Sequence, residues 1–435
     1  MALGGGVFTA QNKKLPGAYI NFVSAARASA VLSERGIAAL PISMNWGEAG
    51  KVFTLTSEDF IYNSRRILGY DYTDDALMGL REVFKHAQKV LVYRLDTAAT
   101  KATNKFADAK FGGTRGNDLK IVITANADTP ANFDVKTLLG TVEVDLQTNV
   151  ATSTDNLVDN DFVTWKAGVS LEVTASTPLT SGTNGTVAAA NWQTALSAFE
   201  SETFNTFGAV TTDSSIVKLV AAWTKRMRDE VGVKFQSVVY NYAADDKGII
   251  NVVSTTTTGN SADLVYWVTG AQAGCAVNRS CTNMVYDGEL AVDVEKSQDD
   301  LTDCIDNGQF VFHKVGDEVR VLTDINSKVT VTEDEGEDFK SNQVIRVIDQ
   351  YGNDVAVLFN TKYLGIIQNN QSGRISFWND VVKLQQQLEN LGATEDYDSA
   401  DTVVTQGNTK KEVVVNDALT PVGAMEKLYL TCVVR

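Results

Sequence analysis

Histidine and cysteine are scarce in this chain of 435 residues, although these two residue types supply most nucleophiles, general bases and soft metal ligands in enzymes. The two histidines, His86 and His313, lie far apart in the sequence, and the four cysteines form no C-x-x-C pair. Isolated residues of these types more often have a structural role, as solvated side chains or buried reduced thiols. No G-x-S-x-G segment marks a hydrolase nucleophile. We therefore predict no catalytic residue, no cofactor and no metal ion.

Positive charge is also in short supply. The chain has 38 Lys and Arg against 54 Asp and Glu, which gives a formal net charge of -16. Proteins that bind nucleic acid concentrate basic charge, so we expect no nucleic-acid partner. The glycine-rich segment 112–118 lacks the Lys-Ser/Thr ending of a phosphate-binding loop and precedes a strand rather than a helix. This segment predicts a turn that leads into a β domain.

Long apolar runs are missing as well. A run such as Val90-Leu91-Val92-Tyr93 is far shorter than the ~20 residues that a membrane-spanning helix needs. The N-terminal residues lack the apolar core of a signal peptide. We expect a soluble protein that does not insert into a membrane and is not exported by the usual route.

The composition is that of a folded protein, with only five prolines and 44% hydrophobic residues. A chain of this length is expected to form about three domains. Residues 25–96 read as strand, helix, helix, strand, which is typical of an α/β unit. Thr56, Glu58 and Asp59 form a start signal for the first helix.

The pattern changes at about residue 97. Short alternating apolar and polar segments follow one another, separated by stretches rich in turn-forming residues and without a helical period. Such a pattern predicts a small β-sandwich inserted at residues 97–180. The expected strands include residues 119–123, 133–135, 142–146 and 169–173.

Strands alternate with helices again over residues 181–332, which favours a mostly parallel sheet in an α/β core domain. A helix over residues 262–276 is rich in glycine and alanine, so we expect it to pack closely against a neighbour. The acidic run 333–338 predicts a loop. Two amphipathic helices and short strands follow, which indicate a further helical domain of α+β type over residues 333–410.

Each end of the chain carries a strand-like segment without an evident partner. Near the start, apolar residues alternate after Pro16-Gly17, within a polar and glycine-rich arm of residues 1–24. Near the end, residues 411–435 finish in a similar apolar strand. We expect both arms to pair with other copies of the chain. The residues assigned to this pairing are Pro16, Gly17, Tyr19, Ile20, Phe22, Val23, Leu428, Tyr429, Leu430 and Val433. The predicted fold is a multidomain α/β protein (α+β overall) with an inserted β-sandwich and two extended β-strand arms.

Six short segments carry a resemblance to a known family. They are LPGAYINF at 15–22, FGGTRGNDL at 111–119, GTNGT at 182–186, VTGAQAG at 268–274, DINS at 324–327 and AMEKLY at 424–429. Together and in this order they resemble the tail sheath proteins of contractile phage tails and R-type bacteriocins. The resemblance covers nearly the whole chain.

This resemblance implies a structural subunit that polymerises as stacked hexameric rings around a tail tube. It also implies contraction from a metastable extended state, which drives the tube through a cell envelope. The implied partners are other copies of the chain, the tail tube protein, and the baseplate and tail terminator proteins. The implied location is the tail of a virion or phage-tail-like particle, synthesised and assembled in the bacterial host cytoplasm.

Two matters stay open in the sequence. The particle is either an infectious phage tail or a headless bacteriocin-like one. If the tube is acidic, basic residues of the C-terminal domain that faces it, Lys362, Arg374 and Lys383, are candidates for contact with it. The alternative function is a cell-surface or carbohydrate-binding enzyme with the β-sandwich as its binding module, which would require a carboxylate pair in a cleft.

Overall fold

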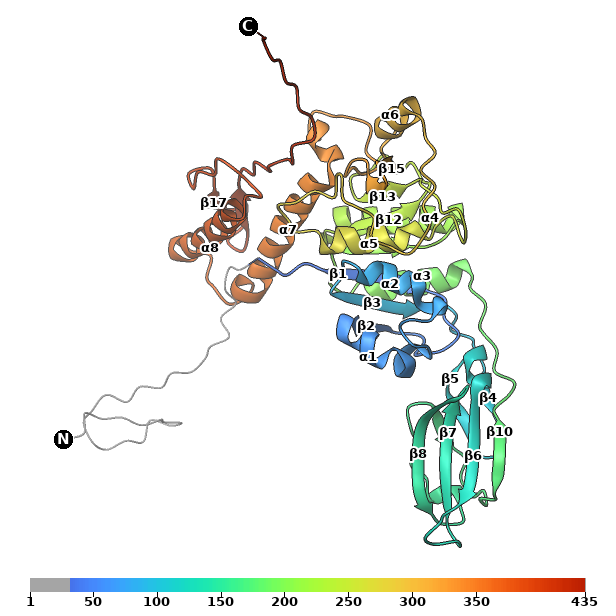
Figure 1. Cartoon of the computed structure of the whole chain (residues 1–435). Helices are drawn as coiled ribbons and strands as arrows, with labels where there is room; N and C mark the ends of the chain where they lie inside the picture. The colour runs from blue at the N-terminus through green and yellow to red at the C-terminus, as the bar shows by residue number, and fades with distance from the viewer. Residues whose placement is uncertain (1–31, 435) are drawn as a thin grey trace, which may run out of the picture.

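A seven-stranded sheet forms the centre of the molecule (Figure 1). The computed structural model describes residues 32–434 of the chain. The strand order is β14-β13-β12-β11-β1-β3-β2, and all neighbouring strands run parallel except β2 and β3. The strands are β1 (Ile37–Ile42), β2 (Val52–Thr56), β3 (Lys89–Arg94), β11 (Thr206–Ala209), β12 (Gln236–Tyr240), β13 (Ile249–Val252) and β14 (Gln309–Phe310).

Two segments that are far apart in the sequence build this one sheet. Strands β1 to β3 precede the β-sandwich insertion, and β11 to β14 follow it. The central strand β1 lies between β3 and β11, so that Ala38 is opposite both Val90 and Thr206. Parallel strands covered on both faces require apolar residues in succession, which explains the run in β1. The predicted, mostly parallel α/β sheet is confirmed.

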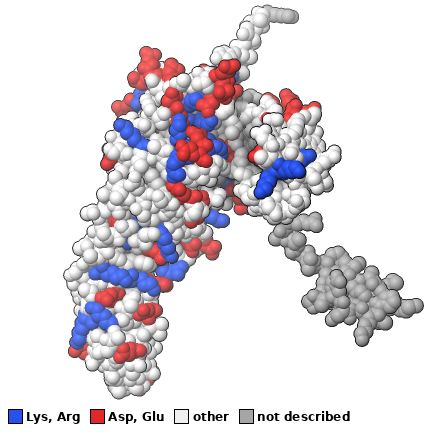
Figure 2. Space-filling model, turned by 180° about the vertical axis from the view of Figure 1, so that it is seen from behind, with Lys and Arg blue, Asp and Glu red and all other residues white. Residues whose placement is uncertain are grey.

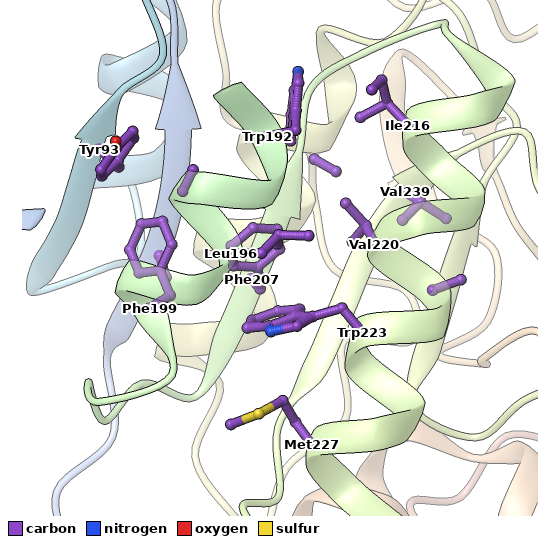
Figure 3. Close-up of a cluster of buried hydrophobic side chains, with 14 of the residues drawn as sticks. Tyr93, Trp192, Leu196, Phe199, Phe207, Ile216, Val220, Trp223, Met227 and Val239 are labelled. Carbon is purple, nitrogen blue, oxygen red and sulfur yellow. The ribbon is translucent and has the colours of Figure 1, made fainter. Parts of the chain in front are cut away.

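Helices cover both faces of the sheet. Side chains such as Ala38 and Leu40 pack under α1 and α2 on one face, while Ala39 joins a second cluster on the other. Figure 3 shows this second cluster, where the Phe207 ring of β11 lies 5.0 Å from the Trp223 ring of α4. The helices are α1 (Ser57–Leu68), α2 (Met78–Phe84), α3 (Ala189–Phe199), α4 (Ser214–Arg226) and α5 (Leu264–Gly274).

Two local signals in the sequence are confirmed. The Thr56 side chain accepts a hydrogen bond of 3.1 Å from the backbone N–H of Asp59 and so caps α1. The small residues of α5 allow close packing against α2. A Cβ atom added at Gly270 would lie only 2.3 Å from the carbonyl oxygen of Val83, so glycine alone fits at this contact.

The insertion forms a β-sandwich at one end of the molecule (Figure 1). One sheet has the order β10-β6-β7-β8 and the other β4-β5-β9. The strand predicted at residues 169–173 is wrong, because the segment pairs only through an isolated antiparallel bridge between Ser170 and Ser153. Leu171 is buried against the sandwich core, which produces the alternation, but its backbone N–H bonds to the loop carbonyl of Thr152. The strands are β4 (Lys101–Thr103), β5 (Ala107–Gly112), β6 (Leu119–Ala125), β7 (Phe133–Leu139), β8 (Val142–Val150), β9 (Val163–Trp165) and β10 (Thr174–Pro178).

A single tryptophan from the core domain anchors the sandwich. Trp46 follows β1, yet its side chain is 1% exposed within the sandwich core. Its ring meets Phe111 edge-on at 5.4 Å and stacks on Phe162 at 6.2 Å. A contact also runs from the insertion to the core domain: the Nε of Arg115, just before β6, donates to the carbonyl oxygen of Gly69 at 2.8 Å. The sandwich is therefore held to the core by packing as well as by its two connecting chains.

The C-terminal unit consists of two long helices and a hairpin. Helix α7 (Asn342–Leu358) runs from the core to α8 (Gln371–Asn390), and the hairpin β17 (Val403–Gln406) and β18 (Val413–Asn416) packs beside α8 (Figure 1). The acidic run 333–338 precedes α7, largely in a loop as predicted. The remaining elements are α6 (Gln298–Asp306), β15 (Phe312–Val315), β16 (Glu318–Val321) and the single turns η1 (Asp75–Leu77), η2 (Thr114–Asp118), η3 (Thr154–Asn156), η4 (Met227–Val231), η5 (Glu337–Lys340) and η6 (Phe359–Tyr363).

Candidate assembly site at the roots of the two arms

The N-terminal side of the described chain is fastened to α7. The Oγ of Ser33 donates to Oδ1 of Asp354 at 2.6 Å, and the amide Nε2 of Gln350 donates back to Oγ of Ser33 at 2.7 Å. The backbone N–H of Leu32 donates to the side-chain oxygen of Gln387 on α8 at 3.1 Å. We call residues 32–36 the N-root, because the predicted N-terminal arm precedes them in the sequence.

A half-buried arginine continues the N-root into the core. The guanidinium of Arg35 donates to the carbonyl oxygens of Cys275 and Gln272, both at 3.0 Å. Burial and the neighbouring Arg346 guanidinium lower the pKa of Arg35 to about 9. The next backbone N–H groups, of Gly36 and Ile37, both donate to the Asn205 side chain. The chain is thus fixed from residue 32 until it enters β1.

The C-terminal arm is fastened near the other end of α7. Gln343 binds the arm twice: its Nε2 donates to the carbonyl oxygen of Val422 at 2.9 Å, and its Oε1 accepts from the N–H of Ala424 at 3.0 Å. The carboxylate of Glu426 then accepts from the hydroxyls of Thr282, at 2.6 Å, and Thr323, at 3.2 Å. We call residues 421–426 the C-root.

Beyond Glu426 the chain leaves the body as an extended segment (Figure 1). Within residues 32–434, this segment has no strand partner. Its apolar side chains face solvent, with Leu428 at 87% and Leu430 at 81% exposure. Exposed apolar residues in a continuous row mark an interaction site. The predicted arm residues here are Leu428, Tyr429, Leu430 and Val433, and all four are exposed. The predicted residues of the other arm, Pro16, Gly17, Tyr19, Ile20, Phe22 and Val23, lie outside the described residues.

Two buried ion pairs hold α7 against the core. Arg346 lies 3.1 Å from Asp324, and each side chain is 1% exposed. Burial would raise the pKa of Asp324, but the guanidinium of Arg346 and three hydrogen bonds hold it below its ordinary value. Asp349 accepts from the guanidinium of Arg228 at 2.8 Å. Burial would lower the pKa of Arg228, and the Asp349 carboxylate raises it above its usual range.

The basic residues predicted to face the tube all lie in the C-terminal unit, Lys362 in η6 and Arg374 and Lys383 in α8. Figure 2 shows basic side chains on one face of this unit. Lys362 pairs with Asp380, and the Nζ of Lys383 lies 3.9 Å from the same carboxylate. Arg374 donates to the side-chain oxygen of Asn369 at 3.0 Å. Lys383, with 63% of its side chain exposed, is the most accessible ammonium of the group. Their contact with a tube stays a prediction.

The hairpin of β17 and β18 is the nearest sheet to these groups. Val404 pairs with Val415, and these two side chains pack on the α8 cluster, while Val403 and Val414 are exposed. Among residues 32–434, no third strand joins either edge of this hairpin. A two-stranded sheet with open edges can accept a further strand.

In the part of the chain that the structure describes, no three His, Cys, Asp or Glu side chains are grouped to hold a metal ion. Across residues 32–434, every helix is too short or too polar to cross a membrane.

Comparisons with known proteins agree along the chain. Models of the "Tail sheath protein Gp18 domain III N-terminal region", the "Phage tail sheath protein beta-sandwich domain", the "Phage tail sheath protein central domain" and the "Phage tail sheath C-terminal domain" match residues 35–95, 96–184, 185–327 and 334–435. The crystal structure of the sheath tail protein of Desulfitobacterium hafniense is 34% identical, with a TM-score of 0.82 over 95% of this chain and 99% of that one. The chain belongs to the phage tail sheath protein family.

Two Bacillus subtilis relatives match this sheath protein over almost their full length. YqbK, described as uncharacterized, is 31% identical over 100% of both chains, and the phage-like element PBSX protein XkdK is 31% identical over 98% of this chain and 99% of its own. The contracted helical sheath of the anti-feeding prophage shares the fold, with a TM-score of 0.58 at 11% identity over 97% of this chain and 99% of that one. As a member of the tail sheath family, the protein is a component of a phage tail or phage-like particle. The predicted structural, non-catalytic role is confirmed by the family, and the alternative of a carbohydrate-binding enzyme is set aside.

The sequence pattern did not indicate the residues that fasten the two roots, and the pairing of the arms stays a prediction. Gln343, Gln350 and Asp354 lie in the first of the two amphipathic helices predicted after residue 338, and its apolar period assigns them no role. Their spacing could have indicated a shared role, because residues seven and four positions apart lie on the same side of a helix.

Proposed function

We propose that this sheath protein polymerises as stacked hexameric rings around a tail tube. The sheath contracts from a metastable extended state and drives the tube through a target cell envelope. The observation that carries the proposal is the exposed apolar segment 427–434, which has no strand partner within residues 32–434. A row of apolar residues at this exposure is costly in a free subunit, and burial against another copy removes the cost.

The connection between subunits is β-augmentation. An extended arm adds a strand to an open sheet edge, and its main-chain hydrogen bonds supply affinity while alternate side chains supply register. The acceptor is the hairpin of β17 and β18, whose open edges lie on the C-terminal unit. The N-terminal strand at residues 18–23 and the C-terminal strand at residues 428–434 of neighbouring copies meet there.

Contraction needs no nucleotide in this account. The subunit bodies rotate as rigid units, because Trp46 anchors the sandwich and the pair of Arg346 and Asp324 anchors α7. The arms keep the bodies connected while the contacts between bodies change. The energy released is the difference between the extended and contracted sets of contacts.

The other partners follow from the same role. The tube protein contacts the inner, C-terminal unit, with Lys362, Arg374 and Lys383 as the candidate basic contacts, and baseplate and tail terminator proteins bind the two ends of the sheath. Assembly takes place in the bacterial host cytoplasm. The particle is a phage tail or an R-type bacteriocin.

A proline scan of the two arms tests the linkage. Tyr19→Pro or Leu430→Pro removes a backbone donor from one strand and should block polymerisation, whereas Leu430→Ala keeps the donor and should still assemble. Sedimentation of the purified proteins separates polymer from subunit. Normal polymer from both proline variants would overturn the strand-exchange model.

A further inference from the structure

We propose that helix α7 is the strut that fixes the separation and direction of the two arms of each subunit, with Gln343 as the positioning residue for the C-terminal arm. The inference rests on the proposed function, in which the arms link neighbouring copies. It adds a specific element and specific side chains that set the geometry of those links.

The first step is that one side of α7 holds both roots. Gln343 binds the C-root, and Gln350 and Asp354 bind Ser33 of the N-root. These three residues are spaced by seven and four positions, which places them on one side of a helix with 3.6 residues per turn. At a rise of 1.5 Å per residue, Gln343 and Asp354 lie ~16 Å apart along the axis.

The second step is that a different side of α7 is bonded to the core. Its residues Asn342, Arg346, Asp349 and Asn353 follow the same helical spacing, one position before the arm-binding set. Arg346 pairs with Asp324. The other core bonds are from Gln236 Nε2 to Asn342 Oδ1 at 2.9 Å, from Arg228 to Asp349 at 2.8 Å, and between the Asn353 side chain and the backbone of Lys234 at 2.7 and 3.0 Å.

Four successive core contacts along one helix prevent α7 from sliding or turning by itself. A slip of one residue would take a buried guanidinium away from its carboxylate, which costs far more than a surface rearrangement. The two roots therefore move together with the core. When a body rotates, both of its links are displaced by amounts that the core and α7 determine.

Gln343 also sets the direction of the C-terminal arm. Its side-chain amide bonds one carbonyl and one N–H of the arm, at Val422 and Ala424, as a neighbouring strand would. The side chain is 3% exposed, so water does not replace these bonds readily. Two residues further on, Glu426 makes the last contacts of the C-root before the arm extends into solvent.

The test is Gln343→Met, which keeps the length of the side chain and removes both hydrogen bonds. The matched control is Gln386→Met, the same change at an exposed position of α8. In the full-length free subunit, hydrogen exchange at the Ala424 amide should become about fivefold faster in Gln343→Met only, since one hydrogen bond contributes about 1 kcal/mol. Circular dichroism should show both variants folded.

Assembly then decides the inference. Tubes of Gln343→Met should be absent or should differ from the parent in helical twist and rise by electron microscopy, while Gln386→Met tubes match the parent. Gln343→Met tubes with the parent twist and rise would overturn the strut. Deletion of residues 427–435 separates the two claims: normal tubes without this segment would contradict the proposed function itself, whereas failure of that deletion with unaffected Gln343→Met tubes would refute only the strut.

Discussion

Arg346 of α7 and Asp324 of the core form an ion pair of 3.1 Å in which each side chain is 1% exposed. Gln272 and Asn342 also donate to the Asp324 carboxylate, at 2.6 and 2.9 Å. The pair therefore joins the core, the start of α7 and the end of α5 in one buried network. Such a pair specifies a single arrangement, because each charge is costly without the other.

Arg346→Ala should lower the free energy of unfolding by about 3–5 kcal/mol, since the Asp324 carboxylate would stay buried without its cation. Urea unfolding of the free subunit measures this loss. The double variant Arg346→Met with Asp324→Leu removes both charges and should lose less than the single variant. A loss below about 0.5 kcal/mol for Arg346→Ala would contradict the role given to this pair.

Substitution by alanine at two helix glycines should change the stability of the protein in opposite directions. Gly270→Ala brings a Cβ to 2.3 Å from a carbonyl oxygen of the α2 region and should destabilise the core by about 1–3 kcal/mol. A Cβ atom added by Gly352→Ala on α7 would lie no closer than 3.9 Å to a neighbouring side chain. This variant should stabilise the protein by about 0.5–1 kcal/mol, because alanine has the higher helix propensity. Thermal unfolding of the two variants measures both signs. Equal effects would refute the close approach of α5 to α2.

Local signals in the sequence predicted much of the fold. The cap at Thr56, the small residues of α5, and the alternating strands of the sandwich each depend on neighbours in the chain or on a simple period. The segment at residues 169–173 misled for the same reason. Its alternation arises because Leu171 packs on the sandwich core, and alternation alone does not say whether backbone pairing extends beyond a single bridge.

Long-range relationships were beyond the sequence pattern. Nothing near Trp46 indicates that its ring belongs to a domain that begins 50 residues later. Likewise, Gln343 and Ala424 are joined across 81 positions, and no local rule predicts such a contact. The proposed arms rest on a local pattern, an apolar strand-like segment near each end of the sequence, whereas the residues that fasten their roots are brought together only in the folded core.

Trp46→Ala should loosen the sandwich from the core. The ring is buried between Phe111 and Phe162, so its loss should cost about 3–5 kcal/mol. Trp46→Phe should cost less, because the indole N–H has no hydrogen-bond partner among residues 32–434 to lose. Hydrogen exchange in β5 and β9 should accelerate in the alanine variant. Unchanged exchange in both strands would show that the connecting chains alone hold the sandwich.

The N-root should be sensitive to pH through Asp354. Burial raises the pKa of this carboxyl above its ordinary value, against the hydrogen bonds from Ser33 and Gln350. The folded state then binds a proton more readily than the unfolded chain. The resulting stabilisation is complete below the ordinary carboxyl pKa of about 4. It is lost as the pH rises through the raised pKa of Asp354 in the folded state.

The measurement is hydrogen exchange at the Ser33 amide, corrected for the intrinsic pH dependence of exchange. The amide should be less protected near pH 7 than near pH 4, which is about the ordinary pKa of a carboxyl group. Asp354→Asn should remove this dependence, because the amide does not titrate. Protection that increases with pH in the parent would contradict the assignment to Asp354.

The central claim is that the arms join copies of the chain into a sheath, and negative-stain electron microscopy of purified protein tests it most directly. Full-length chains should form long hollow tubes. A chain without residues 1–24, which keeps the N-root and the core, should stay folded and appear only as separate subunits. Normal tubes from the truncated chain would contradict the account.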